Sequence, residues 1–190
     1  MAEHNSEDLR NLDSVKAFVA AAERYCTLLE NHKDYMAYEF LREVANALAS
    51  LYLAALNLQE PELDEEDEPP LRVTYEPKDF SAIRTKLGQY DIYSLVYDPY
   101  DTSRKENITF TVTSDLTEIY HDLSKYFNTY REGTLSESRE ALWQWQFQFE
   151  IHWGLHILHV LHAIHWLISD SQHTFKPKEP IDWDDLEQKS

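Results

Sequence analysis

Apolar residues recur at helical spacing through most of the chain, and this pattern predicts a bundle of helices. The first stretch begins at Asp13 or Ser14, either of which can cap a helix, and it runs to about Glu30 with its apolar positions on one face. After a short turn, a second stretch is expected to begin with Asp34 as its cap and to end near Leu58. Two helices joined by so short a link are expected to pack antiparallel.

The middle of the chain has a mixed pattern. A third helix is expected from Lys78 to Leu87, and the apolar residues beyond Gly88 indicate that it resumes as far as about Asp98. The segment 108–112, ITFTV, has the composition of a strand. Because no partner strand is evident, we expect this segment to be an extended connection.

Two long helices are predicted to complete the bundle. Ser114 is a good N-cap for a helix that continues to about Glu132. Thr134 and Glu137 have the spacing of a capping box, in which each residue's side chain binds the other's backbone N–H, so they are expected to start the last helix. The capping residues therefore predict a helix boundary close to residue 133.

The last helix contains the most apolar stretch of the chain, at residues 143–168. It is expected to reach about Asp170, with a bend near Gly154. Since each residue turns about 100° along a helix, apolar residues on nearly every side predict a helix that is buried all round. The predicted fold class is therefore all-α: a single-domain bundle of five or six helices around a long, buried C-terminal helix.

The bundle domain is expected to span residues 13–171. It would contain an acidic loop at 59–70, and residues 1–12 and 172–190 would be flexible or loosely docked tails. Prolines interrupt both ends of the loop, which is typical of an exposed segment. The candidate acidic interaction segment within it consists of Glu60, Glu62, Asp64, Glu65, Glu66, Asp67 and Glu68.

The chain is strongly acidic, with 35 Asp and Glu against 17 Lys and Arg and a net charge of −18. Such a surface repels phosphates, so direct binding to nucleic acid or to anionic membranes is disfavoured. The charge is compatible with a basic protein partner and equally with simple solubility. Cys26 is the single cysteine and cannot form an intrachain disulfide. The N-terminus lacks the pattern of a secretory signal, so a cytoplasmic location is expected.

Histidines and carboxylates form two complementary stripes on the last two long helices. Three histidines of the last helix share a face at i, i+4 and i+7, and three carboxylates of the preceding helix, starting at Asp115, share a face at i, i+3 and i+7. If the helices pack antiparallel, the stripes can meet. The candidate polar or metal cluster is His152, His156, His159, Glu118 and Asp122.

This cluster has three interpretations. Imidazole and carboxylate ligands would suit Zn, Fe or Mn, and bundles do build metal sites between facing helices. A polar pocket without metal is the second interpretation, and a structural cluster of satisfied buried groups is the third. The chain has neither an HExxH motif nor the paired Glu-x-x-His signature of di-iron bundles, and it contains no other catalytic motif.

Four segments carry a resemblance to a known family. They read AFVAAAERYCTLLEN, LGQYDIYSLVYDPYD, SDLTEIYHDLSKYF and ALWQWQFQFEIHWGLHILHVLHAIHWL. Together they resemble the bacterial domain-of-unknown-function family DUF5063, and the resemblance covers about Val15 to Trp166. It implies a small intracellular helical domain in bacteria. It implies no activity, cofactor or partner.

These observations lead to two hypotheses about function. The first is a non-enzymatic protein-interaction module, which the negative charge, the aromatic-rich helices and the lack of a catalytic motif favour. The second is a metal-binding protein or metalloenzyme that uses the histidine and carboxylate cluster between the last two long helices. The sequence does not fix an oligomeric state.

Overall fold

The computed structural model describes residues 9–59, 61, 73, 75–95 and 108–169. These residues form a helical domain with one small sheet, so the all-α prediction is confirmed. In chain order the helices and strands are α1 (Asp13–Glu30), α2 (Ala37–Leu56), α3 (Ser81–Leu87), β1 (Ile92–Leu95), β2 (Ile108–Thr111), α4 (Val112–Ser124), α5 (Phe127–Glu132), α6 (Leu135–Gln148) and α7 (Gly154–Ser169).

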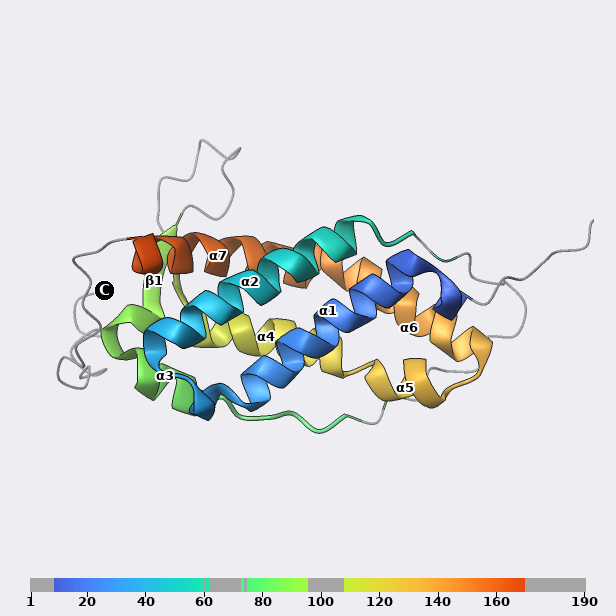
Figure 1. Cartoon of the computed structure of the whole chain (residues 1–190), viewed down its shortest axis with the longest axis horizontal. Helices are drawn as coiled ribbons and strands as arrows, with labels where there is room; N and C mark the ends of the chain where they lie inside the picture. The colour runs from blue at the N-terminus through green and yellow to red at the C-terminus, as the bar shows by residue number, and fades with distance from the viewer. Residues whose placement is uncertain (1–8, 60, 62–72, 74, 96–107, 170–190) are drawn as a thin grey trace, which may run out of the picture.

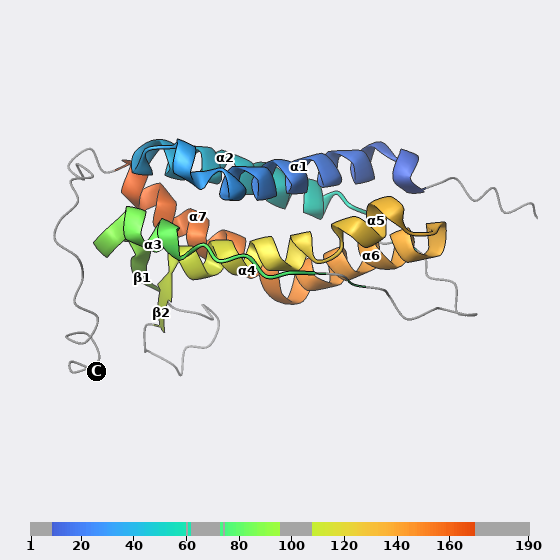
Figure 2. The same cartoon turned by 90° about the horizontal axis from the view of Figure 1, so that it is seen from below.

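The helices form two layers (Figures 1 and 2). Helices α1 and α2 pair in one layer, and α4 to α7 form the other. The layers meet where α2 packs against α7 and where α1 packs against α4. Helix α3 and the β1–β2 hairpin lie together at one end of the molecule. Within the described residues, no helix combines the length and the apolar character that crossing a membrane requires.

The first two helices lie where the sequence predicts them, but their predicted caps are wrong. Leu12 and Met36 occupy the N-cap positions of α1 and α2, and neither side chain caps its helix. Asp34 lies instead in a 3-10 turn, His32–Asp34. The ammonium group of Lys86 donates to the carbonyls of His32 and Tyr35, so a distant lysine satisfies the backbone of this turn.

The segment after α3 differs from the prediction. Gly88 has a φ of +55°, a left-handed conformation that favours glycine, and it ends α3. The chain then forms a 3-10 turn, Gly88–Asp91, and after it strand β1, so the predicted continuation of the helix is wrong for residues 92–95. Strand β1 pairs antiparallel with β2, which gives segment 108–112 the partner strand that the sequence did not indicate. The register places Tyr93 opposite Phe110.

The predicted helix from Ser114 to Glu132 is two helices. Thr111, not Ser114, caps α4, because its hydroxyl accepts the backbone N–H of Ser114 at 3.0 Å. Helix α4 ends at Ser124, and the indole N–H of Trp145 donates to the Leu123 carbonyl at 2.9 Å. This contact satisfies one of the carbonyls that every helix C-terminus leaves without an intrahelical partner.

The last long helix starts at the predicted capping box, in which Thr134 and Glu137 each bind the other's backbone N–H. It is not a uniform α-helix, because residues Phe149–Trp153 form a π-helical turn between α6 and α7. The turn ends at Gly154. A Cβ atom at Gly154 would lie 2.4 Å from the Phe149 carbonyl oxygen, so only glycine fits this close approach.

The last helix is buried on one face rather than all round. Trp145, Trp153, Ile157 and Val160 are fully buried against the rest of the bundle. The opposite face is open, and Trp166 on it is 64% exposed. The prediction of burial on every side is therefore wrong for this face, because α7 lies in a layer at the edge of the bundle instead of at its axis.

Candidate functional site

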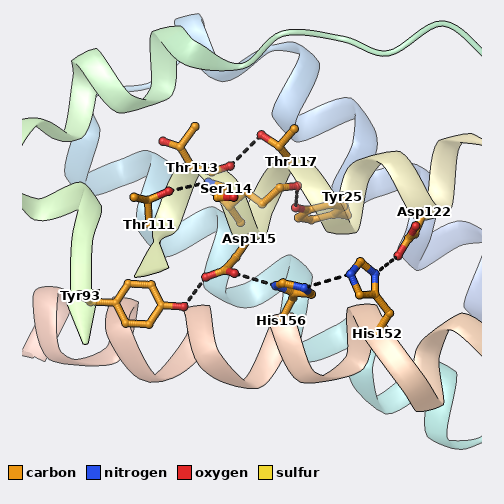
Figure 3. A network of polar contacts seen from close by, with 11 residues as sticks. Tyr25, Tyr93, Thr111, Thr113, Ser114, Asp115, Thr117, Asp122, His152 and His156 are labelled. Carbon is orange, nitrogen blue, oxygen red and sulfur yellow. Dashed lines mark hydrogen bonds and ion pairs between the residues drawn. The ribbon is translucent and has the colours of Figure 1, made fainter. Parts of the chain in front are cut away.

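Two histidines meet between α4 and the last long helix (Figure 3). His152 comes from the π-helical turn, and His156 lies one turn further on, in α7. Their Nε2 atoms are 3.3 Å apart. Each ring has its own aspartate on the other side: His152 Nδ1 is 2.6 Å from Asp122 Oδ2, and His156 Nδ1 is 2.7 Å from Asp115 Oδ1. Both aspartates belong to α4.

The aspartates determine the tautomers of the two rings. An ionised carboxylate only accepts hydrogen bonds, so each Nδ1 atom carries a hydrogen and donates it. If both rings were neutral, the Nε2 atoms of His152 and His156 would face each other with lone pairs only. The 3.3 Å contact between them is a hydrogen bond only when one of the two Nε2 atoms carries a hydrogen.

Asp115 is the buried end of the network. It is only 1% exposed, and its second oxygen accepts the hydroxyl hydrogen of Tyr93 from strand β1. Burial and this bond to Asp115 raise the pKa of Tyr93, so Tyr93 is held as a neutral donor. Asp115 also lies in the first turn of α4, where the helix dipole favours a negative charge. Tyr93 and His156 together provide a hydrogen-bond partner for each oxygen of the buried Asp115 side chain.

The network runs from the interior to the surface. The side chain of His156 is 22% exposed, whereas that of His152 is 41% exposed. The hydrogen bond to Asp115 raises the pKa of His156, and the charges of Asp115, Glu118 and Asp122 act in the same direction. The field of these three carboxylates therefore favours a positive charge on His156.

His159 is not part of the hydrogen-bonded pair. Its ring lies 5.1 Å from the ring of Phe110 and 6.5 Å from that of His156, measured between centroids. Burial lowers the pKa of His159, opposite to the shift at His156. The surroundings thus shift the pKa values of His156 and His159 in opposite directions, although the two residues share one helix face.

The predicted cluster is therefore only partly assembled. The structure brings His152, His156 and Asp122 together, but Asp122 lies behind a ring and does not point to the Nε2 atoms. Glu118 acts through its charge. In the part of the chain that the structure describes, no three or more His, Cys, Asp or Glu side chains form a group able to hold a metal ion.

The sequence did not indicate two further features of the site. Tyr93 lies 22 residues before Asp115, and only the hairpin brings it there. Asp91, fully buried just before β1, accepts hydrogen bonds from the backbone N–H and the hydroxyl of Thr113 at 2.8 and 2.7 Å. It thereby caps the N-terminus of α4 from a distant part of the chain. Burial raises the pKa of Asp91.

A second candidate surface lies on the open face of the last helix. We call it the apolar strip, and it consists of Phe147, Ile151, Leu158 and Trp166, which are 39%, 59%, 46% and 64% exposed. The spacing of these residues places them on one side of the helix. The acidic interaction segment predicted at residues 60–68 lies outside the described residues apart from Pro61.

Comparison with known proteins settles the family. The family model described as "Domain of unknown function (DUF5063)" matches residues 10–170. The chain belongs to the DUF5063 family. The predicted resemblance to DUF5063 is thus confirmed, and it carries no activity with it.

A similar fold is found among solved structures. The crystal structure of protein BF1032 from Bacteroides fragilis has a TM-score of 0.66 and 21% sequence identity, and the match covers 90% of this chain and 99% of that one. At this identity the likeness concerns the fold. No curated protein matches the chain.

Proposed function

We propose that the protein is a helical interaction module that binds a basic protein partner through the apolar strip on its last helix. The observation that carries this proposal is the exposure of four large apolar side chains on one helix face. Scattered apolar residues are normal on a protein surface, but four large apolar side chains along one helix face, here with the exposed His162 between Leu158 and Trp166, are typical of a binding site. Burial of the apolar strip against a partner would remove these side chains from water, which is favourable.

The charge of the chain selects the class of partner. At a net charge of −18, two copies of the chain repel each other, whereas a basic protein is attracted from a distance. Electrostatic attraction of this kind mainly raises the association rate and gives specificity. We therefore expect a partner that presents an apolar helix face flanked by Lys and Arg. Such a role needs no catalytic chemistry.

A pair of variants tests this proposal. Ile151→Ser with Leu158→Ser removes two central residues of the strip, and Met36→Ser is the control, since Met36 is 78% exposed at the N-cap of α2. A protein captured from lysate would be purified and titrated against each variant at low and high salt. We expect the double variant to weaken binding at least about tenfold, equivalent to about 1.4 kcal/mol. The control should bind normally.

Two results would contradict the proposal. In the first, the purified partner binds the double variant as tightly as it binds the unaltered chain. In the second, sedimentation of the chain alone gives a dimer that the double variant dissociates. The strip would then be an interface between two copies, and the proposal of a basic partner would be wrong.

A further inference from the structure

We propose that the Nε2 atoms of His152 and His156 bind one divalent transition-metal cation of the Zn²⁺ class, with Asp122 and Asp115 as the groups that orient the two rings. This site is independent of the apolar strip, because it uses the side of the last helix that faces α4. Three features of the pair favour such a site: the distance between its nitrogen atoms, the contacts behind its rings and its access to solvent.

The distance between the two nitrogen atoms matches a metal chelate. Two nitrogens bound to Zn²⁺ at about 2.0–2.1 Å, with a tetrahedral angle between them, lie about 3.3–3.4 Å apart. The Nε2 atoms of His152 and His156 are 3.3 Å apart. The pair is therefore already spaced to hold a metal ion.

The groups behind the rings are those that metal-binding histidines use. A histidine that ligates a metal almost always donates its other N–H to a carboxylate or carbonyl, which fixes the tautomer and makes the free nitrogen more basic. Asp122 and Asp115 supply this contact to both rings at 2.6 and 2.7 Å. Glu118 adds a third negative charge nearby. The carboxylates together offset the charge of a divalent ion.

The chemistry of the pair narrows the range of metals. Both donor atoms are imidazole nitrogens, which suit Zn²⁺, Cu²⁺, Ni²⁺ and Fe²⁺, whereas Mn²⁺ prefers oxygen ligands. With the aspartate oxygens turned to the Nδ1 side, Mn²⁺ fits the pair poorly. The side chain of His152 is 41% exposed, so water or an external group can complete the coordination shell. Such an open site binds more weakly than a closed site with four protein ligands.

The test is calorimetric titration of the full chain, purified without an affinity tag, with Zn²⁺. We expect one equivalent of Zn²⁺ to bind per chain, and at least tenfold weaker binding in both His152→Ala and His156→Gln. His162→Ala and His165→Ala are matched controls, because these histidines are exposed on the same helix. They should bind Zn²⁺ like the unaltered chain. Asp122→Ala should weaken binding by about 10–100-fold through loss of its contact with the His152 ring.

A second measurement distinguishes binding at the His152–His156 pair from non-specific binding of metal to other surface residues. Co²⁺ in place of Zn²⁺ should give a visible absorption band that disappears in His152→Ala and persists in His162→Ala. His152 is partly exposed, so its replacement leaves the fold intact, and circular dichroism verifies this for each variant. The proposal is wrong if the unaltered chain binds no Zn²⁺, or if the His162→Ala control loses as much affinity as His152→Ala. Neither result bears on the apolar strip.

Discussion

The Nδ1 atom of His156 in α7 donates to the Oδ1 atom of Asp115 in α4 across a distance of 2.7 Å. This contact joins the last helix to the N-terminal turn of α4, and it does so with a carboxylate that is only 1% exposed. Removal of either residue leaves the polar group of the other without this hydrogen bond. Stability should therefore depend on the two residues jointly.

The first prediction concerns this pair. His156→Ala leaves Asp115 buried with Tyr93 as its remaining donor, so we expect the free energy of unfolding to fall by roughly 2–3 kcal/mol. A double-mutant cycle with Asp115→Leu, followed by urea unfolding, should give a coupling energy of about 1 kcal/mol or more. His165→Ala is the exposed control and should stay within about 0.5 kcal/mol. Strictly additive losses would show that the contact has little energetic weight.

The second prediction concerns the π-helical turn. Gly154→Ala would place a Cβ atom 2.4 Å from the Phe149 carbonyl oxygen and 2.8 Å from its ring, so Phe149 and the turn must move. We expect a loss of roughly 1–3 kcal/mol in thermal or urea unfolding, the usual cost of forcing an extra carbon into a packed site. Because His152 lies within the same turn, the NMR chemical shifts of its ring should also change. An unchanged melting temperature would mean that the turn relaxes freely.

The third prediction uses the buried carboxyl of Asp91. Burial raises the pKa of Asp91 above its ordinary value of 3.8, although the bonds from Thr113 oppose the shift. A raised carboxyl pKa contributes stability that is complete below 3.8 and is lost as pH rises through the folded-state pKa. Asp91→Asn keeps an acceptor for Thr113 and removes the charge. Its stability relative to the unaltered chain should therefore increase with pH above 3.8 and then level off.

Asp91→Ala is the matched comparison, because it removes the acceptor as well as the charge. At every pH it should be less stable than Asp91→Asn by about 0.5–2 kcal/mol, the typical cost of deleting a helix cap. Urea unfolding of both variants at a series of pH values measures the two effects separately. Equal pH profiles for Asp91→Asn and the unaltered chain would show that Asp91 does not titrate differently on folding.

The fourth prediction concerns acid sensitivity at Glu30. Burial alone would raise the pKa of Glu30, but hydrogen bonds from Lys78 and Tyr120, both at 2.6 Å, outweigh it and lower the pKa below its ordinary value of 4.5. The associated stability is present above 4.5 and is lost as pH falls through the lowered value. The Glu30 side chain is 41% exposed, so screening by solvent keeps the effect below about 1 kcal/mol.

Glu30→Gln should accordingly be slightly less stable than the unaltered chain at neutral pH, and the difference should vanish in acid. Thermal unfolding followed by circular dichroism at several pH values measures this difference. Glu43→Gln serves as a control, because Glu43 forms a separate, exposed ion pair with Arg24. A difference for Glu30→Gln that persists unchanged in acid would show that the lowered pKa does not contribute to folding.

Local patterns in the sequence were sufficient to predict α1, the capping box at Thr134 and the shared face of His152 and His156. In each case the determining residues lie within a few positions of one another along one helix. The pairing of these histidines with aspartates of α4 was also predicted in outline, because two polar stripes on otherwise apolar helices favour contact. What the pattern could not show was which imidazole nitrogen faces which carboxylate.

The features that sequence reasoning missed depend on contacts between distant residues. Strand β1 contains apolar residues that fit a helix or a strand, and only its pairing with β2 decides between them. The sequence likewise does not reveal the open face of the last helix. An apolar face gives the same periodicity whether another element covers it or not. The cap of α4 by Asp91 and the contact of Tyr93 with Asp115 both follow from the hairpin.

The packing of α2 against α7 has a consequence for synthesis of the protein on the ribosome. Helices α1 and α2 emerge early and can pair with each other, but the face of α2 that receives α7 stays uncovered until nearly the whole domain has been translated. A nascent chain therefore exposes the apolar side chains of α2 for most of its synthesis. Chains that stop before α7 lack the element that covers this face, so they are natural targets for chaperones and proteases.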